Sequence, residues 1–378
     1  MRAVGSVAGT GSGPRGLCGV RGGGVRDQCG RAESGGHEKA ERPSAASDGS
    51  SSGCHSSKRK RCHTERQGSV TSVAAVRRRS PRTGGDLAEA LGLHPRGAAD
   101  FLDALVALGF LERSEGVYRN SPSADTFLDR SKATYAGGIL EMANSRLYPF
   151  WGSLTEALHT GKPQNEHKHG GDVFDAIYHD QEGLERFLHG MTGLSMGKAM
   201  VIAERFPWAD CRTVLDVGGA VGCVPVAVAQ RHPHMSGGVF ALPRVRPVFE
   251  KYVASFGLED RLTFHGGDFF TDDLPRADVI VLGQILHGWG LEEKRLLLKE
   301  AYDALPDGGA VLVYDAIVDD DRKENTFGLL ASLNMLIETR SGFEYPAADG
   351  RAWLADTGFS GSRIEPLTDG YSMLVGIK

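Results

Sequence analysis

Residues 213–222 read Thr-Val-Leu-Asp-Val-Gly-Gly-Ala-Val-Gly, a short apolar run that breaks into glycines. The run predicts a buried strand, and Pro225 beyond it suits the first turn of a helix, where its missing N–H costs nothing. Glycines let a backbone approach a ligand closely, and a helix N-terminus presents free N–H groups to that ligand. The segment therefore predicts a binding turn, of a kind that many nucleotide-binding folds share.

Strands and helices continue to alternate toward the C-terminus. Further strands are expected in four segments, which are residues 237–243, 262–270, 277–289 and 306–318. Helical patterns are found at residues 245–256, 291–305 and 325–338. Such alternation predicts a parallel sheet that is covered on both faces. Residues 362–367 and 371–378, separated by Thr-Asp-Gly, predict a closing antiparallel hairpin.

The chain carries LDVGGAVG, FALP, GDFF, LHGWGLEE and Phe343-Glu344 in this order. With these motifs, the chain from about residue 85 to residue 378 resembles the class I S-adenosylmethionine-dependent O-methyltransferases. The resemblance is to the small-molecule branch, which includes caffeate-type, acetylserotonin-type and bacterial antibiotic-tailoring enzymes. Members typically carry LDVGGGTG, FDLP, GDFF, LHDW-D-E and a late glutamate at the corresponding positions. The implied fold is α/β: a Rossmann-like methyltransferase sheet with a terminal antiparallel hairpin, preceded by a winged-helix-like α domain and a disordered N-terminal arm.

Composition divides the chain near residue 84. Residues 1–84 hold 16 Lys and Arg against 6 Asp and Glu, and they contain no Phe, Trp, Tyr or Ile. Such a segment cannot bury enough apolar surface to offset the entropy lost on ordering, so we expect a disordered basic arm. The resemblance implies a dimerisation and substrate-enclosing helical domain at residues 85–190 and an S-adenosylmethionine-binding catalytic domain at residues 191–378.

Several patterns are absent from the sequence. No run approaches 18 apolar residues, no apolar signal segment opens the chain, and the six cysteines suggest no disulfide framework. We therefore expect a cytoplasmic protein with no membrane partner. His167, His169 and His179 lie in or near a loop rich in Gly and Lys, which favours a solvated loop over a metal site, so we expect no bound metal.

Residues 86–120 have a winged-helix pattern, which can indicate DNA binding. Asp86 is expected to cap the first helix. The second helix has only Arg96 as a cation and also carries Asp100 and Asp103, which makes a poor surface for phosphates, so we expect no nucleic-acid partner. In the resembled family this module serves dimerisation. Its usual apolar N-terminal helices are not visible here, so we expect a weakened homodimer.

Methyl transfer to a hydroxyl requires a group that removes the acceptor's proton. Histidine is the usual side chain for this task because its ordinary pKa lies near neutrality. His287 follows the fourth expected strand, at the carboxyl edge where open α/β sheets bind their ligands. The resemblance implies that His287 is the general base and that Asp315 and Glu344 flank it. Glu338 is expected to be solvated surface.

The resemblance implies S-adenosyl-L-methionine as the cofactor and a hydroxyl of a small, aromatic metabolite as the acceptor. Three glycines would shape the turn that holds the cofactor: Gly218, Gly219 and Gly222. Asp268 would accept a hydrogen bond from the adenine amino group, and Phe269 would pack on the adenine ring. Ser195 would contact the methionine moiety.

Three departures from the family pattern keep a second interpretation open. A ribose-binding acid is expected about 20 residues beyond the glycines, but Ala241 stands there. Losing that contact would cost about 1.5–3 kcal/mol, or roughly ten- to a hundredfold in affinity. Gly288 and Gly290 also replace acids. The chain is therefore either a working O-methyltransferase with weakened cofactor affinity or a binding protein that keeps the fold and has lost turnover.

Overall fold

The computed structural model describes residues 82–132, 134–169, 181–368 and 370–378. The expected arm at residues 1–84 lies almost entirely outside these ranges, as does His179, and the side chains of His167 and His169 are also outside the description. Among the described residues, no helix is long and apolar enough to cross a membrane.

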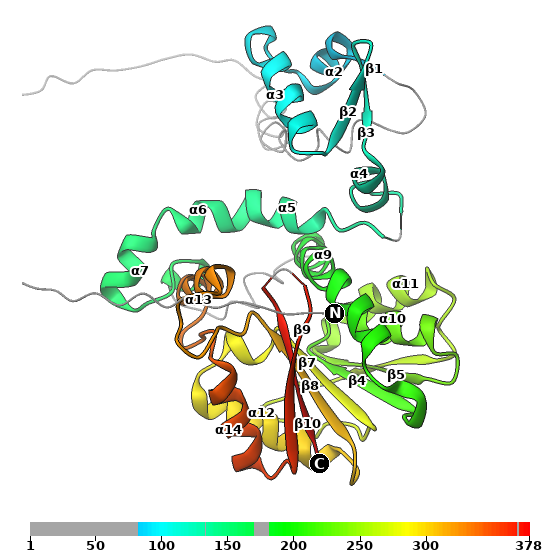
Figure 1. Ribbon diagram of the computed structural model, residues 1–378, viewed down its shortest axis with the longest axis vertical. Coiled ribbons are helices and arrows are strands. Elements are labelled where there is room, and N and C mark those ends of the chain that lie inside the picture. Colours follow the sequence, from blue (N-terminus) through cyan, green and yellow to red (C-terminus); the bar gives the residue numbers. More distant parts are fainter. Residues whose placement is uncertain (1–81, 133, 170–180, 369) are drawn as a thin grey trace, which may run out of the picture. The chain divides into compact units, whose positions relative to one another are not determined.

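The centre of the fold is a seven-stranded sheet with the order β6-β5-β4-β7-β8-β10-β9 (Figure 1). The first five strands in this order are parallel, and β10 runs antiparallel between β8 and β9. The strands are β4 (Thr213–Val217), β5 (Ser236–Ala241), β6 (Leu262–Gly266), β7 (Val279–Gly283), β8 (Ala310–Asp315), β9 (Gly361–Pro366) and β10 (Ser372–Ile377). The predicted parallel sheet and its closing hairpin are confirmed.

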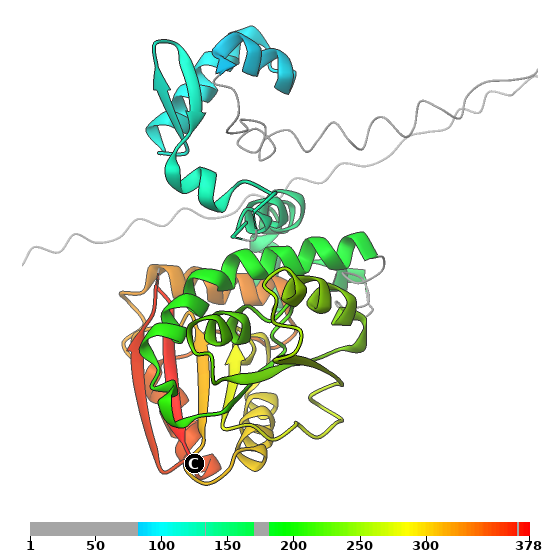
Figure 2. The same cartoon turned by 90° about the vertical axis from the view of Figure 1, so that its right-hand side faces the viewer.

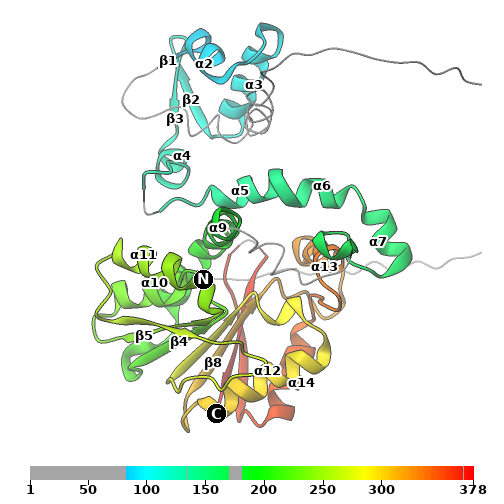
Figure 3. The ribbon, with the colours of Figure 1, turned by 180° about the vertical axis from the view of Figure 1, so that it is seen from behind.

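Helices cover both faces of this sheet, as predicted (Figures 1 and 3). One face packs against α9 (Gln181–Arg205), α10 (Cys223–Arg231) and α11 (Arg246–Ala254). The other packs against α12 (Leu291–Ala304) and α14 (Ala347–Thr357). Figure 2 shows α9, in green, along its length.

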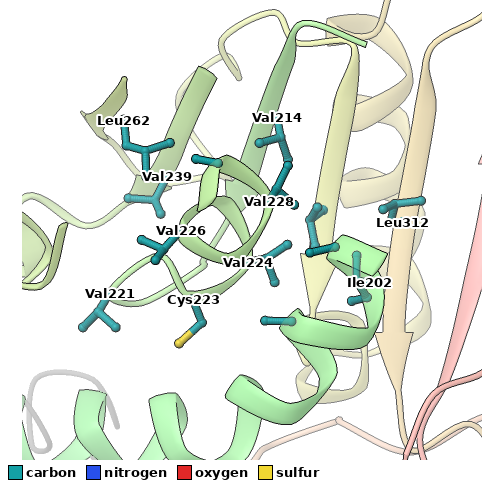
Figure 4. Close-up of a cluster of buried hydrophobic side chains, with 14 of the residues drawn as sticks. Ile202, Val214, Val221, Cys223, Val224, Val226, Val228, Val239, Leu262 and Leu312 are labelled. Carbon is teal, nitrogen blue, oxygen red and sulfur yellow. The ribbon is translucent and has the colours of Figure 1, made fainter. Parts of the chain in front are cut away.

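The two faces have separate apolar cores because successive strand residues point to opposite sides. In β7, Val279 and Val281 join the cluster under α10, whereas Ile280 and Leu282 join the cluster under α12. Figure 4 shows part of the first cluster, in which the side chains of α10 lie between those of β4 and β5 and Ile202 of α9. With both faces buried, the central strands are apolar throughout, which accounts for the continuous runs in the sequence.

Four parallel strands end earlier than predicted, and the site lies in the turns that follow. β5, β6, β7 and β8 stop two, four, six and three residues before their expected limits. After β7, Gln284 adopts φ +57° and turns the chain into the short 3₁₀ helix η5 (Leu286–Gly288). His287 therefore lies on a turn beyond the strand and not at the end of it.

Residues 82–120 form a small module with a sheet of its own. It contains α2 (Gly84–Leu91), α3 (Pro95–Ala107) and a sheet of the order β1-β3-β2 (Arg82–Thr83, Val117–Asn120 and Leu111–Ser114). The predicted winged-helix pattern is present with one additional strand. The expected cap was wrong: Thr83 caps α2, and Asp86 accepts a hydrogen bond from the Thr83 N–H in a capping box. Asp86 therefore lies inside the first turn.

The remaining helices lie between these elements in the sequence. They are α4 (Pro122–Phe127), α5 (Gly138–Met142), the π-helical turn η1 (Ala143–Leu147), α6 (Tyr148–Trp151), α7 (Leu154–Thr160), η2 (Glu166–His169), η3 (Trp208–Asp210), η4 (Pro243–Val245) and α13 (Thr326–Glu338). The expected boundary between residues 190 and 191 falls inside α9. The division into domains remains a prediction.

Candidate active site

The glycine turn after β4 requires backbone angles that glycine adopts easily. Gly218 has φ +68° and Gly222 has φ +88°. A Cβ on Gly218 would collide with the side chain of Ile285, and one on Gly222 would lie 3.0 Å from the ring of Phe249. Gly222 begins α10 without a side-chain cap, so the first N–H groups of this helix are available to a ligand.

One residue in this turn is strained. Ala220 adopts φ +49°, at the position where the family motif has its third glycine. A left-handed conformation costs an L-residue with a Cβ about 1 kcal/mol relative to glycine. The turn therefore keeps the backbone path of the motif at an energetic cost.

Asp268 and Phe269 lie in the turn after β6, at the same edge of the sheet. The Asp268 carboxylate accepts the Phe270 N–H at 3.0 Å, and the Asp268 N–H donates to Asp272. The Phe269 ring packs edge-on against Phe270, with centroids 4.8 Å apart, and against Trp289 at 6.0 Å. These contacts hold an acid and an aromatic ring side by side.

Ser195 belongs to a polar group that the sequence did not reveal. Its hydroxyl accepts a hydrogen bond from Gln284 Nε2 at 2.8 Å, and Gln284 Oε1 accepts one from the Tyr371 hydroxyl at 3.2 Å. These residues come from α9, from the turn after β7 and from the C-terminal hairpin. The positive φ of Gln284 aims its side chain, and no local hydropathy pattern signals such an angle.

His287, Asp315 and Glu344 are brought together, although 57 residues of sequence separate the outer two. His287 Nδ1 lies 2.6 Å from Glu344 Oε1 and 3.8 Å from Asp315 Oδ1. Both carboxyl side chains are completely buried, whereas the imidazole is 14% exposed. Asp315 Oδ2 also accepts a hydrogen bond from the Tyr345 hydroxyl at 2.8 Å. The sequence did not identify Tyr345.

Opposing effects set the charges in this cluster. Burial alone would lower the pKa of His287, but the negative charges of Glu344 and Asp315 outweigh burial and raise it to about 9. Burial raises the pKa of Asp315 to about 7, against the lowering effect of His287. The imidazole therefore holds its proton tightly in the free protein.

A buried lysine also lies beside this cluster. The Nζ of Lys294, in the first turn of α12, donates to the Trp289 carbonyl at 2.6 Å and to the Phe343 carbonyl at 3.3 Å. Burial lowers the pKa of Lys294 to about 8, although Asp315 and Glu344 act in the opposite direction. This residue was not predicted from the sequence.

Glu338 was wrongly expected to be solvated. Its side chain is 11% exposed and forms an ion pair with Arg146, which also binds Glu166 Oε2 at 2.8 Å. Burial raises the pKa of Glu338 despite that arginine. The end of α13 is thereby joined to η1, and the glutamate is part of an internal contact.

The three positions that depart from the family motifs can be located in the structure. Ala241 ends β5 with only 7% exposure, so no acid stands at that strand end. A Cβ on Gly288 would have no heavy atom within 4 Å, so the acid that the family carries has room there. On Gly290, by contrast, a Cβ would lie 2.7 Å from Glu293 Oε2.

Comparisons with known proteins show what this arrangement belongs to. Residues 151–360 match the O-methyltransferase domain family, and residues 73–130 match the O-methyltransferase dimerisation domain family. The tetracenomycin polyketide synthesis 8-O-methyl transferase TcmO of Streptomyces glaucescens is 44% identical over 295 residues, which are 78% of this chain and 86% of that relative. The chain belongs to the O-methyltransferase family.

Two other relatives of this O-methyltransferase support the same assignment. The 3-hydroxy-5-methyl-1-naphthoate 3-O-methyltransferase of Streptomyces sahachiroi is 34% identical over 276 residues, covering 73% of this chain and 79% of that one. The structure of human N-acetylserotonin methyltransferase in complex with SAM has a TM-score of 0.72 and 26% identity, over 83% of this chain and 92% of that chain. All are named as enzymes, so the alternative of a binding protein without turnover is not supported.

The cofactor of this O-methyltransferase is S-adenosylmethionine, and the sheet edge fits it. The glycine turn leaves no room for a Cβ at Gly218, and α10 presents uncapped N–H groups. Beneath the turn, Asp216 Oδ1 is buried and has no hydrogen-bond partner in the described part of the chain. Burial raises the pKa of Asp216 to about 8. A site with unmet hydrogen-bonding capacity suits a polar ligand.

Proposed function

We propose that this O-methyltransferase methylates a hydroxyl of a small aromatic metabolite, with His287 as the general base. The observation that carries the proposal is the 2.6 Å contact between His287 Nδ1 and Glu344 at the carboxyl edge of the sheet. When Nδ1–H donates to Glu344, Nε2 is left with the lone pair that accepts the proton. Asp315 and Glu344 orient the ring and stabilise the imidazolium that forms.

Methyl transfer to a hydroxyl moves a methyl group from the cofactor to the acceptor and a proton from the acceptor to the protein. S-adenosylmethionine supplies an electrophilic methyl group on a sulfonium and leaves as S-adenosylhomocysteine. The acceptor oxygen forms the new O–C bond as the S–C bond breaks, and His287 Nε2 takes the hydroxyl proton. The chain's other task is positioning, because the attack must be in line.

We assign cofactor binding to six residues, which are Gly218, Gly219, Gly222, Asp268, Phe269 and Ser195. The glycines shape the turn, Asp268 accepts from the adenine amino group, and Phe269 packs on the ring. Ser195 contacts the methionine moiety. Binding is expected to be weak because Ala241 offers no carboxylate to the ribose.

The aromatic acceptor is suggested by relatives whose names specify a naphthoate, a tetracenomycin and N-acetylserotonin. The match to a dimerisation domain supports a homodimer. Sedimentation of the full chain tests this, and a monomer at high concentration would contradict it. A cytoplasmic location is also proposed from the cysteine pattern: Cys211 and Cys223 are both unpaired.

The base is tested with His287→Ala and His287→Gln on a panel of hydroxynaphthoates and N-acetylserotonin. Both variants should lose roughly a hundredfold or more in kcat and retain affinity for S-adenosylhomocysteine, as is usual when a positioned base is lost. His189→Gln, which changes an exposed histidine on α9, is the matched control and should be fully active. Full activity of His287→Ala on an unactivated hydroxyl would remove His287 from the mechanism.

A further inference from the structure

The ammonium of Lys294 lies in an unusual position for a lysine. The residue is completely buried, on the face of α12 that also carries Leu297 and Leu298. Its Nζ stands 3.6 Å from the centroid of the Phe343 ring and 5.6 Å from that of Tyr345. Among the described residues no ion pair joins it to a carboxylate, and two backbone carbonyls accept its hydrogen bonds.

Those two carbonyls connect Lys294 to the catalytic turns. Trp289 follows His287 by two residues, and Phe343 immediately precedes Glu344. One ammonium therefore binds both the segment that carries the base and the segment that carries its acidic partner. A methionine could fill the space but has no hydrogen to donate to either carbonyl.

Lys294 reduces the net negative charge of the cluster. Asp315 and Glu344 are fully buried, and each has one oxygen without a hydrogen-bond partner in the described part of the chain. When His287 is neutral and ready to accept a proton, Lys294 is the buried cation beside these two acids among the described residues, since Arg322 is exposed. Without that cation, they would hold the proton on the imidazole more strongly.

We propose that Lys294 is a positioning residue whose buried charge favours the neutral form of His287 beside Asp315 and Glu344. The inference rests on the proposed role of His287 as the base. Other groups face the cluster and stay constant in the test. The Tyr345 hydroxyl donates to Asp315, Tyr371 lies within range of the charges of both acids, and Arg322 donates to the Glu344 carbonyl at 3.3 Å. Glu293 acts on Lys294 from the same helix.

The test compares kcat/KM of the wild type and Lys294→Met between pH 6.5 and pH 10, with N-acetylserotonin or a hydroxynaphthoate as the acceptor. At pH 7 the wild-type Lys294 is charged, and its loss should raise the pKa of His287 by about one unit, which is roughly a tenfold loss of kcat/KM. Above pH 9 the wild-type lysine has lost its own proton, because its pKa is about 8. The ratio of the two enzymes should therefore fall toward one.

A purely structural role would give a ratio that does not change with pH, and that result would overturn the proposal. Lys299→Met is the matched control, since Lys299 is exposed on the same helix and pairs with Asp303. Its ratio to the wild type should stay near one at every pH.

If Lys294→Met does not fold, ¹⁵N NMR of the lysine side chains in the wild-type protein replaces it. A charged ammonium at pH 7 supports the proposal, and a neutral amine at that pH overturns it. This measurement needs no acceptor, so it separates the role of Lys294 from that of the proposed base. An active His287→Gln enzyme would refute the base and leave the NMR result standing.

Discussion

Restoring a carboxylate at the end of β5 should tighten S-adenosylmethionine binding about tenfold. Ala241 follows Phe240, whose carbonyl accepts the Gly218 N–H at 2.8 Å, so an aspartate there would lie beside the glycine turn. Charge-assisted hydrogen bonds to the ribose are worth about 1.5–3 kcal/mol, or roughly ten- to a hundredfold. At 7% exposure the new carboxylate also loses hydration, which subtracts from the gain. We therefore expect the lower end of this range for Ala241→Asp.

Calorimetric titration with S-adenosylmethionine and S-adenosylhomocysteine measures the change. Ala241→Asn is the matched control, because its amide oxygen accepts hydrogen bonds but carries no charge, and its gain should be smaller. The free Ala241→Asp protein should melt earlier than the wild type, and its Tm should rise more on adding ligand. Sub-micromolar binding by the wild type that Ala241→Asp leaves unchanged would refute the reasoning.

Other substitutions probe the strain and the buried charges. Wild-type kcat/KM should rise with pH and level off only above pH 9, because His287 must first lose its proton and its pKa is about 9. Glu344→Gln should lower the midpoint of this rise by about one unit and reduce the plateau, and a pH–rate profile with an unmoved midpoint would contradict this. Ala220→Gly should raise the free energy of unfolding in urea by up to about 1 kcal/mol, because Ala220 has a positive φ. A loss of stability would show that the backbone is not strained at this residue. Arg146→Met should cost about 3 kcal/mol at pH 7.5 because Glu338 is left buried and unpaired. The cost should shrink toward pH 5, since burial raises the pKa of Glu338 and protonation then neutralises it; a cost that is independent of pH would argue against this cause.

The sheet could be predicted because both of its faces are buried. Continuous apolar runs that alternate with amphipathic helices are typical of parallel strands joined by helical crossovers. The exact strand ends could not be predicted. β7 ends where Gln284 takes a positive φ, and the turn after β6 is fixed by the bond from Asp268 to the Phe270 N–H. Both depend on side-chain hydrogen bonds that hydropathy does not report.

The site could be predicted only in part. His287, Asp315 and Glu344 were found through motif order. The neighbouring strands β7 and β8 lead into His287 and Asp315, and the bridge between Val318 and Pro346 holds the segment of Glu344 beside the chain that follows β8. The burial of Lys294 could have been predicted from its helical spacing, since it is three and four residues before the buried Leu297 and Leu298. The burial of Glu338 could not, because its partner Arg146 is 192 residues away and only the folded chain joins them.

The wrong or missing predictions about buried charged side chains have a common physical cause. Sequence reasoning assigns charged side chains to the surface because burying an isolated charge costs several kcal/mol. That rule fails where the fold supplies partners, and here it fails for Lys294, Glu338 and Arg146. Lys294 has carbonyls, rings and two nearby carboxylates, while Glu338 has its arginine. A lysine at helical spacing on an apolar face is therefore best treated as a candidate for a buried charge. In this enzyme that charge binds the two segments that carry His287, the proposed base, and Glu344.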